Sequence, residues 1–204
     1  LPCLDDPDMR RGKPSCHKAS AEATALLGAD ALLTAAFEVL CNAPNASVEA
    51  VSVLSGAAGA RGMIYGQELD LRFEQVRADA RQLEQIHANK TGKLIKAAVL
   101  LGAVAASASK EQKNALEYYA AQVGMVFQIV DDILDVVSTS EELGKPVGSD
   151  RENGKSTFVT LYGLEESRRM AQEKTKNACD ALELFGESAS FLRTLALSLA
   201  ERKQ

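Results

Sequence analysis

Tryptophan is absent from this sequence, and aromatic residues make up only 5% of it. There is no alternation of β-branched and polar residues that would indicate strands, and no internal repeat. Alanine is abundant, and alanine, leucine, glutamate, lysine and glutamine all favour helix. At 204 residues the chain fits one domain that is large enough to bury a core. We therefore expect an all-α fold.

Excess positive charge, paired cysteines and long apolar runs are also lacking. The formal net charge of −5 weighs against a nucleic-acid partner, although divalent metal can still link acidic sites to phosphates. The four cysteines form no CxxC pair, so we expect reduced thiols rather than a zinc site or disulfides. No uninterrupted apolar run reaches the roughly 18 residues of a membrane span, and no signal peptide is recognised. We expect no stable membrane insertion and a cytoplasmic rather than a plastid location.

The distribution of glycine, proline and apolar residues divides the chain into helices. Residues 1–15 contain three prolines and a glycine and are expected to form a loop. We expect helices over residues 20–41, 47–71, 79–106 and 110–137, a polar loop over 138–156, and one or two further helices. Gly56, Gly59, Gly62 and Gly66 recur at three- and four-residue spacing, which gives a smooth face for close approach of a helix or ligand.

The strongest chemical signal is the segment Gln128-Ile-Val-Asp131-Asp132-Ile-Leu-Asp135. On a helix that turns about 100° per residue, its amide and three carboxylates share one side, opposite an apolar seam. Clustered acidic residues usually form a solvated face. Here no Lys or Arg at three- or four-residue spacing neutralises them. Hard divalent cations prefer several carboxylates from one small region, so the segment predicts a metal site.

Basic residues form three further candidate groups. Asp5, Asp6 and Asp8 precede Arg10-Arg11, which is either a self-neutralised surface loop or a metal and phosphate site.

Lys90 lies within an apolar stripe, where a lysine must extend to water or meet an anion. Thr91 follows and could expose a backbone carbonyl if the helix is distorted. The polar loop contains Gly154-Lys155-Ser156-Thr157, which lacks the upstream glycine of a Walker A motif. Beside the acidic helix, this loop is expected to act as a cationic lid over phosphate.

Together these motifs resemble the trans-isoprenyl diphosphate synthases over nearly the whole chain, and most closely the bacterial farnesyl and geranylgeranyl diphosphate synthases. Residues 1–14 resemble the end of that family's first aspartate-rich motif, and residues 128–135 resemble the second. Gly66-Gln67-Glu-Leu-Asp70, Lys90-Thr91 and Gly154-Lys155-Ser156-Thr157 match further family blocks in the same order.

The resemblance implies a fold, a reaction and a cofactor. The fold is the isoprenoid synthase bundle of long helices around a central cavity, usually as a homodimer. The reaction is the head-to-tail condensation of isopentenyl diphosphate with dimethylallyl or geranyl diphosphate. The product is farnesyl or geranylgeranyl diphosphate, and the cofactor is Mg²⁺, three ions per active site.

The resemblance also assigns residues to these roles. Metal binding falls to Asp5, Asp131, Asp132 and Asp135, the last through water. Substrate binding falls to Arg10, Arg11, Gln67, Lys90, Lys145 and Lys155, with Arg11 on isopentenyl diphosphate. Lys90, Thr91 and Gln128 are the catalytic set, and Thr91 and Gln128 would face the reacting carbons.

One departure from the family pattern matters most. The family's first motif normally begins with two aspartates before Leu-Pro, whereas this chain begins at Leu1. We therefore expect residues 1–204 to be a single domain that lacks its N-terminal helices and has negligible activity alone. The alternatives are a non-catalytic partner subunit of a heteromeric synthase and a related terpene cyclase. Retention of Asp131, Lys90 and Lys155 favours the enzyme, and Arg10-Arg11 with Lys90-Thr91 favours a condensing enzyme.

Overall fold

The computed structural model describes all residues except 5, 11, 75, 138–154 and 203–204, and its described part is helical, as expected. The only strands in that part are the two-residue β1 (Met9–Arg10) and β2 (Lys13–Pro14), which pair as an antiparallel hairpin within the predicted loop. The helices are α1 (Cys16–Ala19), α2 (Glu22–Asn42), α3 (Val48–Ala58), α4 (Met63–Phe73), α5 (Ala80–His87), the π-helix η1 (Ala88–Gly92), α6 (Lys93–Ala105), α7 (Lys110–Val137), α10 (Phe158–Tyr162), α11 (Leu164–Asp180), the 3₁₀-helix η2 (Glu183–Ala189) and α12 (Ser190–Glu201).

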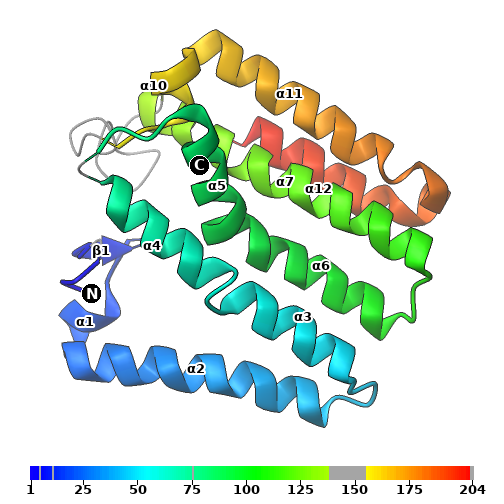
Figure 1. Ribbon diagram of the computed structural model, residues 1–204, viewed down its shortest axis with the longest axis horizontal. Helices are drawn as coiled ribbons and strands as arrows, with labels where there is room; N and C mark the ends of the chain where they lie inside the picture. Colours follow the sequence, from blue (N-terminus) through cyan, green and yellow to red (C-terminus); the bar gives the residue numbers. More distant parts are fainter. Residues whose placement is uncertain (5, 11, 75, 138–154, 203–204) are drawn as a thin grey trace.

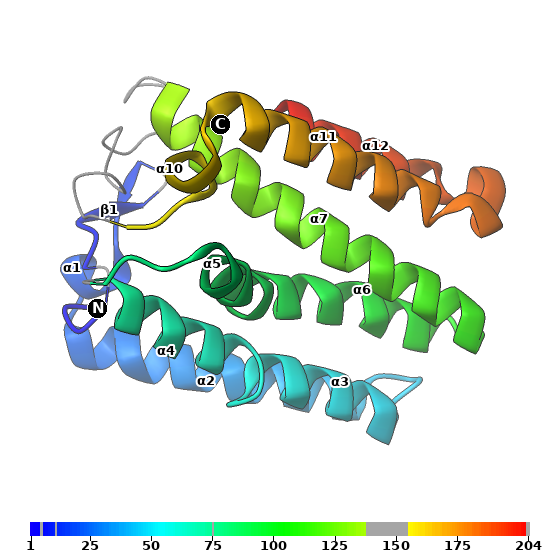
Figure 2. The ribbon, with the colours of Figure 1, turned by 45° about the horizontal axis from the view of Figure 1, so that its top comes forward.

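The long helices lie side by side in roughly chain order, from α2 at one edge to α11 and α12 at the other (Figures 1 and 2). The central helix α7 packs against both α6 and α11. The β1–β2 hairpin, the start of α5, the end of α7 and α10 all lie at one end of the bundle (Figure 1). The fold therefore brings the N-terminal charged segment and the acidic end of α7 to the same end of the molecule.

The core is built along α7. Tyr119, Val123 and Val130 of its predicted apolar seam are buried, whereas Val137 at the end of the helix is exposed. The hydroxyl of Tyr119 donates a hydrogen bond to the carbonyl of Leu192 (2.8 Å), and burial raises the pKa of this phenol to about 12. The seam thus holds α7 against α12 with its buried polar group satisfied.

The predicted helix over residues 47–71 is wrong as a single element, because it breaks between α3 and α4. Gly59 ends α3 and Gly62 precedes α4. A Cβ atom on Gly62 would lie 2.1 Å from the carbonyl oxygen of Ala57, so only glycine fits there. The regular glycine spacing that indicated one smooth helix face therefore includes a break, after which α4 continues along the bundle in the direction of α3 (Figure 1).

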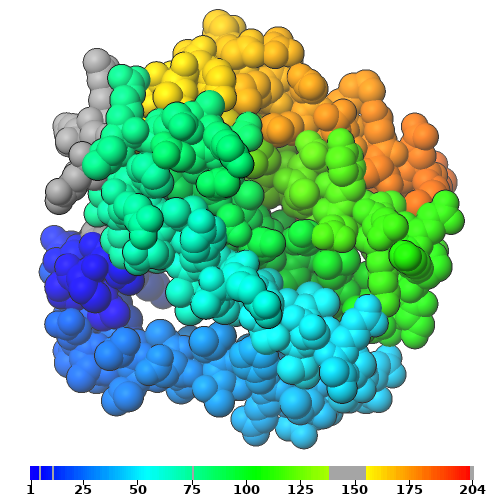
Figure 3. Space-filling view, in the orientation of Figure 1, coloured from blue at the N-terminus to red at the C-terminus, as the bar shows by residue number. Residues whose placement is uncertain are grey.

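Helix α2 buries none of its residues and exposes large apolar side chains, among them Leu27, Leu32 and Val39. An opening separates it from α4 (Figure 3). By length and composition α2 could also cross a membrane. Its mean hydropathy is 1.6, which is high enough although a few acidic residues are scattered along the helix. This differs from the sequence expectation, which counted only uninterrupted apolar runs. Helices of soluble proteins and signal sequences pass the same test, so this property alone does not assign a membrane.

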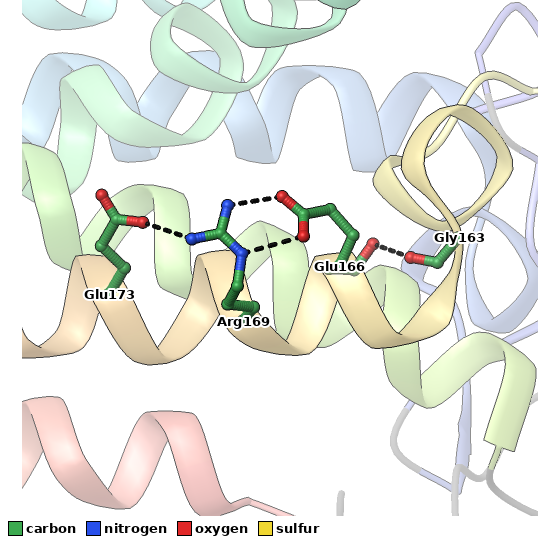
Figure 4. A network of polar contacts seen from close by, with 5 residues as sticks. Gly163, Glu166, Arg169 and Glu173 are labelled. Atoms are coloured by element: carbon green, nitrogen blue, oxygen red, sulfur yellow. Dashed lines mark hydrogen bonds and ion pairs between the residues drawn. The ribbon is translucent and has the colours of Figure 1, made fainter.

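Helix α11 begins after Gly163, whose φ of +82° favours glycine. On its outer face Arg169 forms ion pairs with Glu166 (2.6 Å) and Glu173 (3.1 Å), as Figure 4 shows. The hydrogen bond from Arg169 lowers the pKa of Glu166. Exposed ion pairs of this kind contribute little to the free energy of folding, so we attribute the stability that α11 provides to its buried face.

Candidate functional site

A π-helix carries Lys90 and Thr91. Isolated π turns are rare and frequently mark functional sites. Here η1 joins α5 to α6 without a break in the helix, so the predicted helix over residues 79–106 is confirmed in extent. The wider turn changes the angular phase of the residues that follow it. In the apolar stripe that was predicted around Lys90, Leu83 and Ile86 before the π-helix are buried, but Leu94 after it is 36% exposed.

Glycines on the neighbouring helices let the π-helix pack closely. A Cβ atom on Gly66 of α4 would lie 2.0 Å from the backbone nitrogen of Lys90. On the other side, a Cβ atom on Gly124 of α7 would lie 3.1 Å from the Cα atom of Gly92. The backbone around Lys90 and Thr91 is therefore held between α4 and α7.

Lys90 meets an anion within the protein. Its Nζ atom lies 2.5 Å from Oδ2 of Asp70 on α4, and both side chains are partly buried. The sequence left open whether Lys90 extends to water or meets an anion, and it did not identify this carboxylate. Asp70 ends the family-like block that also contains Gly66 and Gln67, so this block both approaches the π-helix and neutralises its lysine.

Thr91 and Gln128 are brought together, as the resemblance implied. The Thr91 hydroxyl donates to Oε1 of Gln128 (3.2 Å), and the same oxygen lies 2.8 Å from Nδ1 of His87. Burial, the largest cause, lowers the pKa of His87 to about 4, against the opposing effect of its hydrogen bond to Gln128. His87 is thus neutral near pH 7. Sequence reasoning missed His87, although it lies three residues before Lys90.

The three carboxylates of α7 have different surroundings. The side chain of Asp131 is 48% exposed and forms an ion pair with Arg202 (2.5 Å). Asp132 and Asp135 are only 7% and 3% exposed, and the backbone N–H of Phe158 donates to Asp132 (2.7 Å). The expectation that all three carboxylates face away from the core is therefore wrong for two of them. Oriented hydrogen bonds make the burial of a carboxylate tolerable.

Arg202 is the neutralising cation that the local sequence lacked. Its guanidinium also lies 4.2 Å from the ring centroid of Phe127 and donates to that residue's carbonyl (3.0 Å). It comes from the residue after α12, 71 positions beyond Asp131. No local spacing rule could have found this contact.

The donor types suit a hard divalent cation, since three carboxylates lie within two turns of one helix. Among the residues that the structure describes, however, no three His, Cys, Asp or Glu side chains are gathered into a metal-binding group. Asp131 is engaged by Arg202, and Asp132 by Phe158. The α7 carboxylates thus fit a metal in chemistry, but they would have to exchange partners to converge on one.

For the remaining residues predicted from the sequence, the structure shows no hydrogen bond or ion pair with Lys90, Thr91 or Gln128 among the described residues. Asp5, Arg11 and Lys145 lie outside the described residues. Arg10 is exposed on β1, and Lys155 lies 3.9 Å from Glu74. The Nε2 atom of Gln67 is buried and has no hydrogen-bond partner among the residues that the structure describes.

The other N-terminal acids pair with the residues that follow the hairpin. Asp6 contacts His17 (2.7 Å), whose hydrogen bond lowers the pKa of this carboxyl, and Asp8 contacts Lys18 (3.1 Å). The acids of this segment are thus neutralised by His17 and Lys18, and no contact that the structure describes pairs them with the arginines of the proposed surface loop.

One apolar cavity formed by described residues lies away from this site. It has a volume of about 550 Å³ and is lined by Ala98, Gly102, Leu116 and Phe185, among others. They come from α6, from the N-terminal half of α7 and from η2, and the junctions of α6 with α7 and of α11 with α12 lie at the end of the bundle opposite the β1–β2 hairpin (Figure 1). We therefore locate the candidate site by its polar side chains rather than by this cavity.

Comparison with known proteins identifies the class. The family model described as polyprenyl synthetase matches residues 3–186. The chain is 42% identical to farnesyl diphosphate synthase of Micrococcus luteus over 207 residues, covering all of this chain and 71% of the relative. It is 41% identical to the chloroplastic geranylgeranyl pyrophosphate synthase 11 of Arabidopsis thaliana, covering 99% of this chain and 59% of that protein.

The fold agrees with these matches. A geranyltransferase from Helicobacter pylori, solved in complex with magnesium and isoprenyl diphosphate, superposes with a TM-score of 0.83 at 37% identity. The match covers 98% of this chain and 67% of that one. Fold and site thus define an all-α prenyltransferase with the isoprenoid synthase fold. The chain belongs to the polyprenyl synthetase family.

Proposed function

We propose that the protein condenses isopentenyl diphosphate head-to-tail with an allylic diphosphate, in a reaction that depends on Mg²⁺. The observation that carries the proposal is the convergence of Lys90, Thr91 and Gln128 at a π-helix held between α4 and α7. The same stretch of α7 continues into Asp131, Asp132 and Asp135. Relatives named farnesyl and geranylgeranyl diphosphate synthases support the reaction class.

In this reaction the bond from the allylic carbon to the diphosphate oxygen breaks. The double bond of isopentenyl diphosphate supplies the electron pair for the new carbon–carbon bond, and the departing diphosphate then accepts the proton that the condensed cation loses. Bound Mg²⁺ would neutralise charge that develops on the departing diphosphate. Asp131, Asp132, Asp135 and Asp5 would hold the metal, and the magnesium-bound H. pylori relative supports this cofactor.

Lys90 is proposed to exchange Asp70 for the allylic diphosphate. Its ammonium is already held in position by the Asp70 pair and is partly buried, where charge is only partly screened. The binding site for the allylic diphosphate would also include Arg10, Lys155, Gln67 and Lys145. Arg11 would contact isopentenyl diphosphate. Release of Asp131 from Arg202 would free a cation next to the incoming phosphate.

Gln128 and Thr91 are proposed to face the allylic carbon. Positive charge develops on that carbon as the diphosphate departs, and the negative ends of amide and hydroxyl dipoles stabilise it. Both dipoles are fixed by hydrogen bonds in the structure, so little reorganisation is needed during the reaction.

Farnesyl diphosphate is the proposed product, with geranylgeranyl diphosphate as the longer alternative. We further propose a cytoplasmic homodimer whose single domain is completed by helices N-terminal to this segment. The exposed apolar side chains of α2, such as Leu32, support an association surface there.

A product assay on the full-length protein tests the proposal. Isopentenyl diphosphate would be supplied with dimethylallyl or geranyl diphosphate and Mg²⁺, with and without chelator. We expect a C15 or C20 diphosphate that is lost on chelation and in Asp131→Ala. A folded wild-type protein that makes no product would refute the enzyme and favour the partner-subunit alternative.

A further inference from the structure

His87 is a second polar group on the oxygen of Gln128. Its Nδ1 atom lies 2.8 Å from Oε1 of Gln128, and Thr91 Oγ1 lies 3.2 Å from the same atom. A carboxamide oxygen can only accept, so the hydroxyl donates to it and the imidazole carries its hydrogen on Nδ1. One oxygen is therefore held by two donors, from the end of α5 and from η1.

Within the described part of the chain, the other side of the imidazole forms no polar contact. The Nε2 atom of His87 is buried there without a hydrogen-bond partner, and the ring stacks on Phe158 with centroids 5.5 Å apart. A buried acceptor without a donor is unfavourable, and a phenyl ring would stack there without that disadvantage. The Nδ1 hydrogen is thus the feature that distinguishes histidine from phenylalanine at this position.

We infer that His87 is a positioning residue that fixes the carboxamide of Gln128, through its Nδ1–H, in the orientation that faces the allylic carbon. The inference rests on the proposed function for the role of Gln128. A preorganised dipole stabilises developing charge without reorganising during the reaction, and that advantage requires a fixed amide.

The electrostatics of the surroundings agree with this role. Burial lowers the pKa of His87, so the ring stays neutral near the position where a carbocation would form. The charged groups that influence it are Asp70 on α4, Lys90 on η1 and Asp131 on α7. A cationic imidazolium would oppose the carbocation, whereas the neutral ring contributes only its hydrogen bond.

The test compares two substitutions in the full-length protein. His87→Phe keeps the ring that stacks on Phe158 and removes the donor. His87→Asn keeps an N–H near the Nδ1 position and removes the ring. We expect His87→Phe to lower kcat about 10- to 100-fold, with KM for both diphosphates changed less than about 3-fold. His87→Asn should recover most of that loss, which a purely structural role of the ring would not allow.

Two further measurements separate this inference from the proposed function. In the Gln128→Leu background, His87→Phe should cause no additional loss of kcat, because its partner is already gone. Independent losses that multiply would overturn the inference.

The second measurement is the ¹⁵N NMR spectrum of the histidine rings, which needs no activity. It should show the Nδ1–H tautomer for His87 in the wild type and a change in Gln128→Leu. An Nε2–H tautomer in the wild type would overturn the inference whether or not product forms. Absence of product, with the Nδ1–H tautomer present, would refute the proposed function instead.

Discussion

Gly66→Ala tests whether the close approach of α4 fixes the π-helix that carries the site. The added Cβ atom would lie 2.0 Å from the backbone nitrogen of Lys90 and 2.5 Å from its Cα atom. Real Cβ contacts lie beyond 3.0 Å, so α4 and η1 must separate by at least 1 Å, the difference between 3.0 and 2.0 Å. Backbone atoms cannot rotate away as a flexible side chain would.

We expect this overpacking to cost about 3 kcal/mol, the upper part of the usual range. For a chain of this size that lowers Tm by about 6–12 °C. Because Lys90 and Thr91 are displaced by about 1 Å, kcat/KM should fall by about 100-fold. Thermal unfolding by circular dichroism and steady-state kinetics of the full-length protein provide the two measurements.

Gly56→Ala is the matched control. Gly56 is exposed on α3, and a Cβ atom there meets nothing within 4 Å. Alanine is the better helix former, so this change should stabilise the protein by up to about 1 kcal/mol without affecting activity. If Gly66→Ala matched this control in stability and rate, the packing argument would be refuted.

Three other features of the structure give further predictions. Arg202→Gln removes the cation beside Asp131, so Mn²⁺ titrated into the diphosphate-free protein should bind about 5-fold more tightly; unchanged affinity would exclude Asp131 as a ligand. Leu32→Glu should make the proposed dimer monomeric in light scattering, and a monomeric wild type would refute that dimer. The pKa of His87 is about 4 folded and 6.5 unfolded, so the unfolded state binds more protons between these values. The free energy of unfolding by urea should therefore fall by up to about 3 kcal/mol from pH 6.5 to pH 4, and His87→Phe should flatten this fall; an identical slope would contradict it.

Local patterns predicted the elements that local interactions determine. The apolar seam of α7 and the extent of α2 follow from helical periodicity, and both were confirmed. The break at Gly59 and Gly62 was missed because glycine spacing alone does not distinguish a smooth helix face from an interrupted helix. The π-helix was missed as an element because no residue type specifies it. It depends on packing between Gly66 and Gly124.

Motifs predicted which residues belong to the site, but not their partners. The sequence predicted that Lys90 either extends to water or meets an anion, but it could not show that Asp70, 20 positions earlier, is its partner. The sequence overestimated the exposure of the α7 carboxylates. The backbone N–H of Phe158 donates to Asp132, but Phe158 is 26 residues further along the chain, so helical periodicity could not predict this contact. Contacts between distant segments are set by the packing of whole helices, which periodicity does not encode.

The most direct test of the central claim is the steady-state kinetics of Gln128→Leu, with Gln122→Leu as the control, because Gln122 is a partly buried glutamine of the same helix. If the Gln128 amide, held by Thr91 and His87, stabilises the positive charge that develops on the allylic carbon, Gln128→Leu should lower kcat about 100-fold. KM for the allylic diphosphate should change less than about 3-fold, and Gln122→Leu should behave as wild type. A Gln128→Leu protein with wild-type kcat would contradict the account.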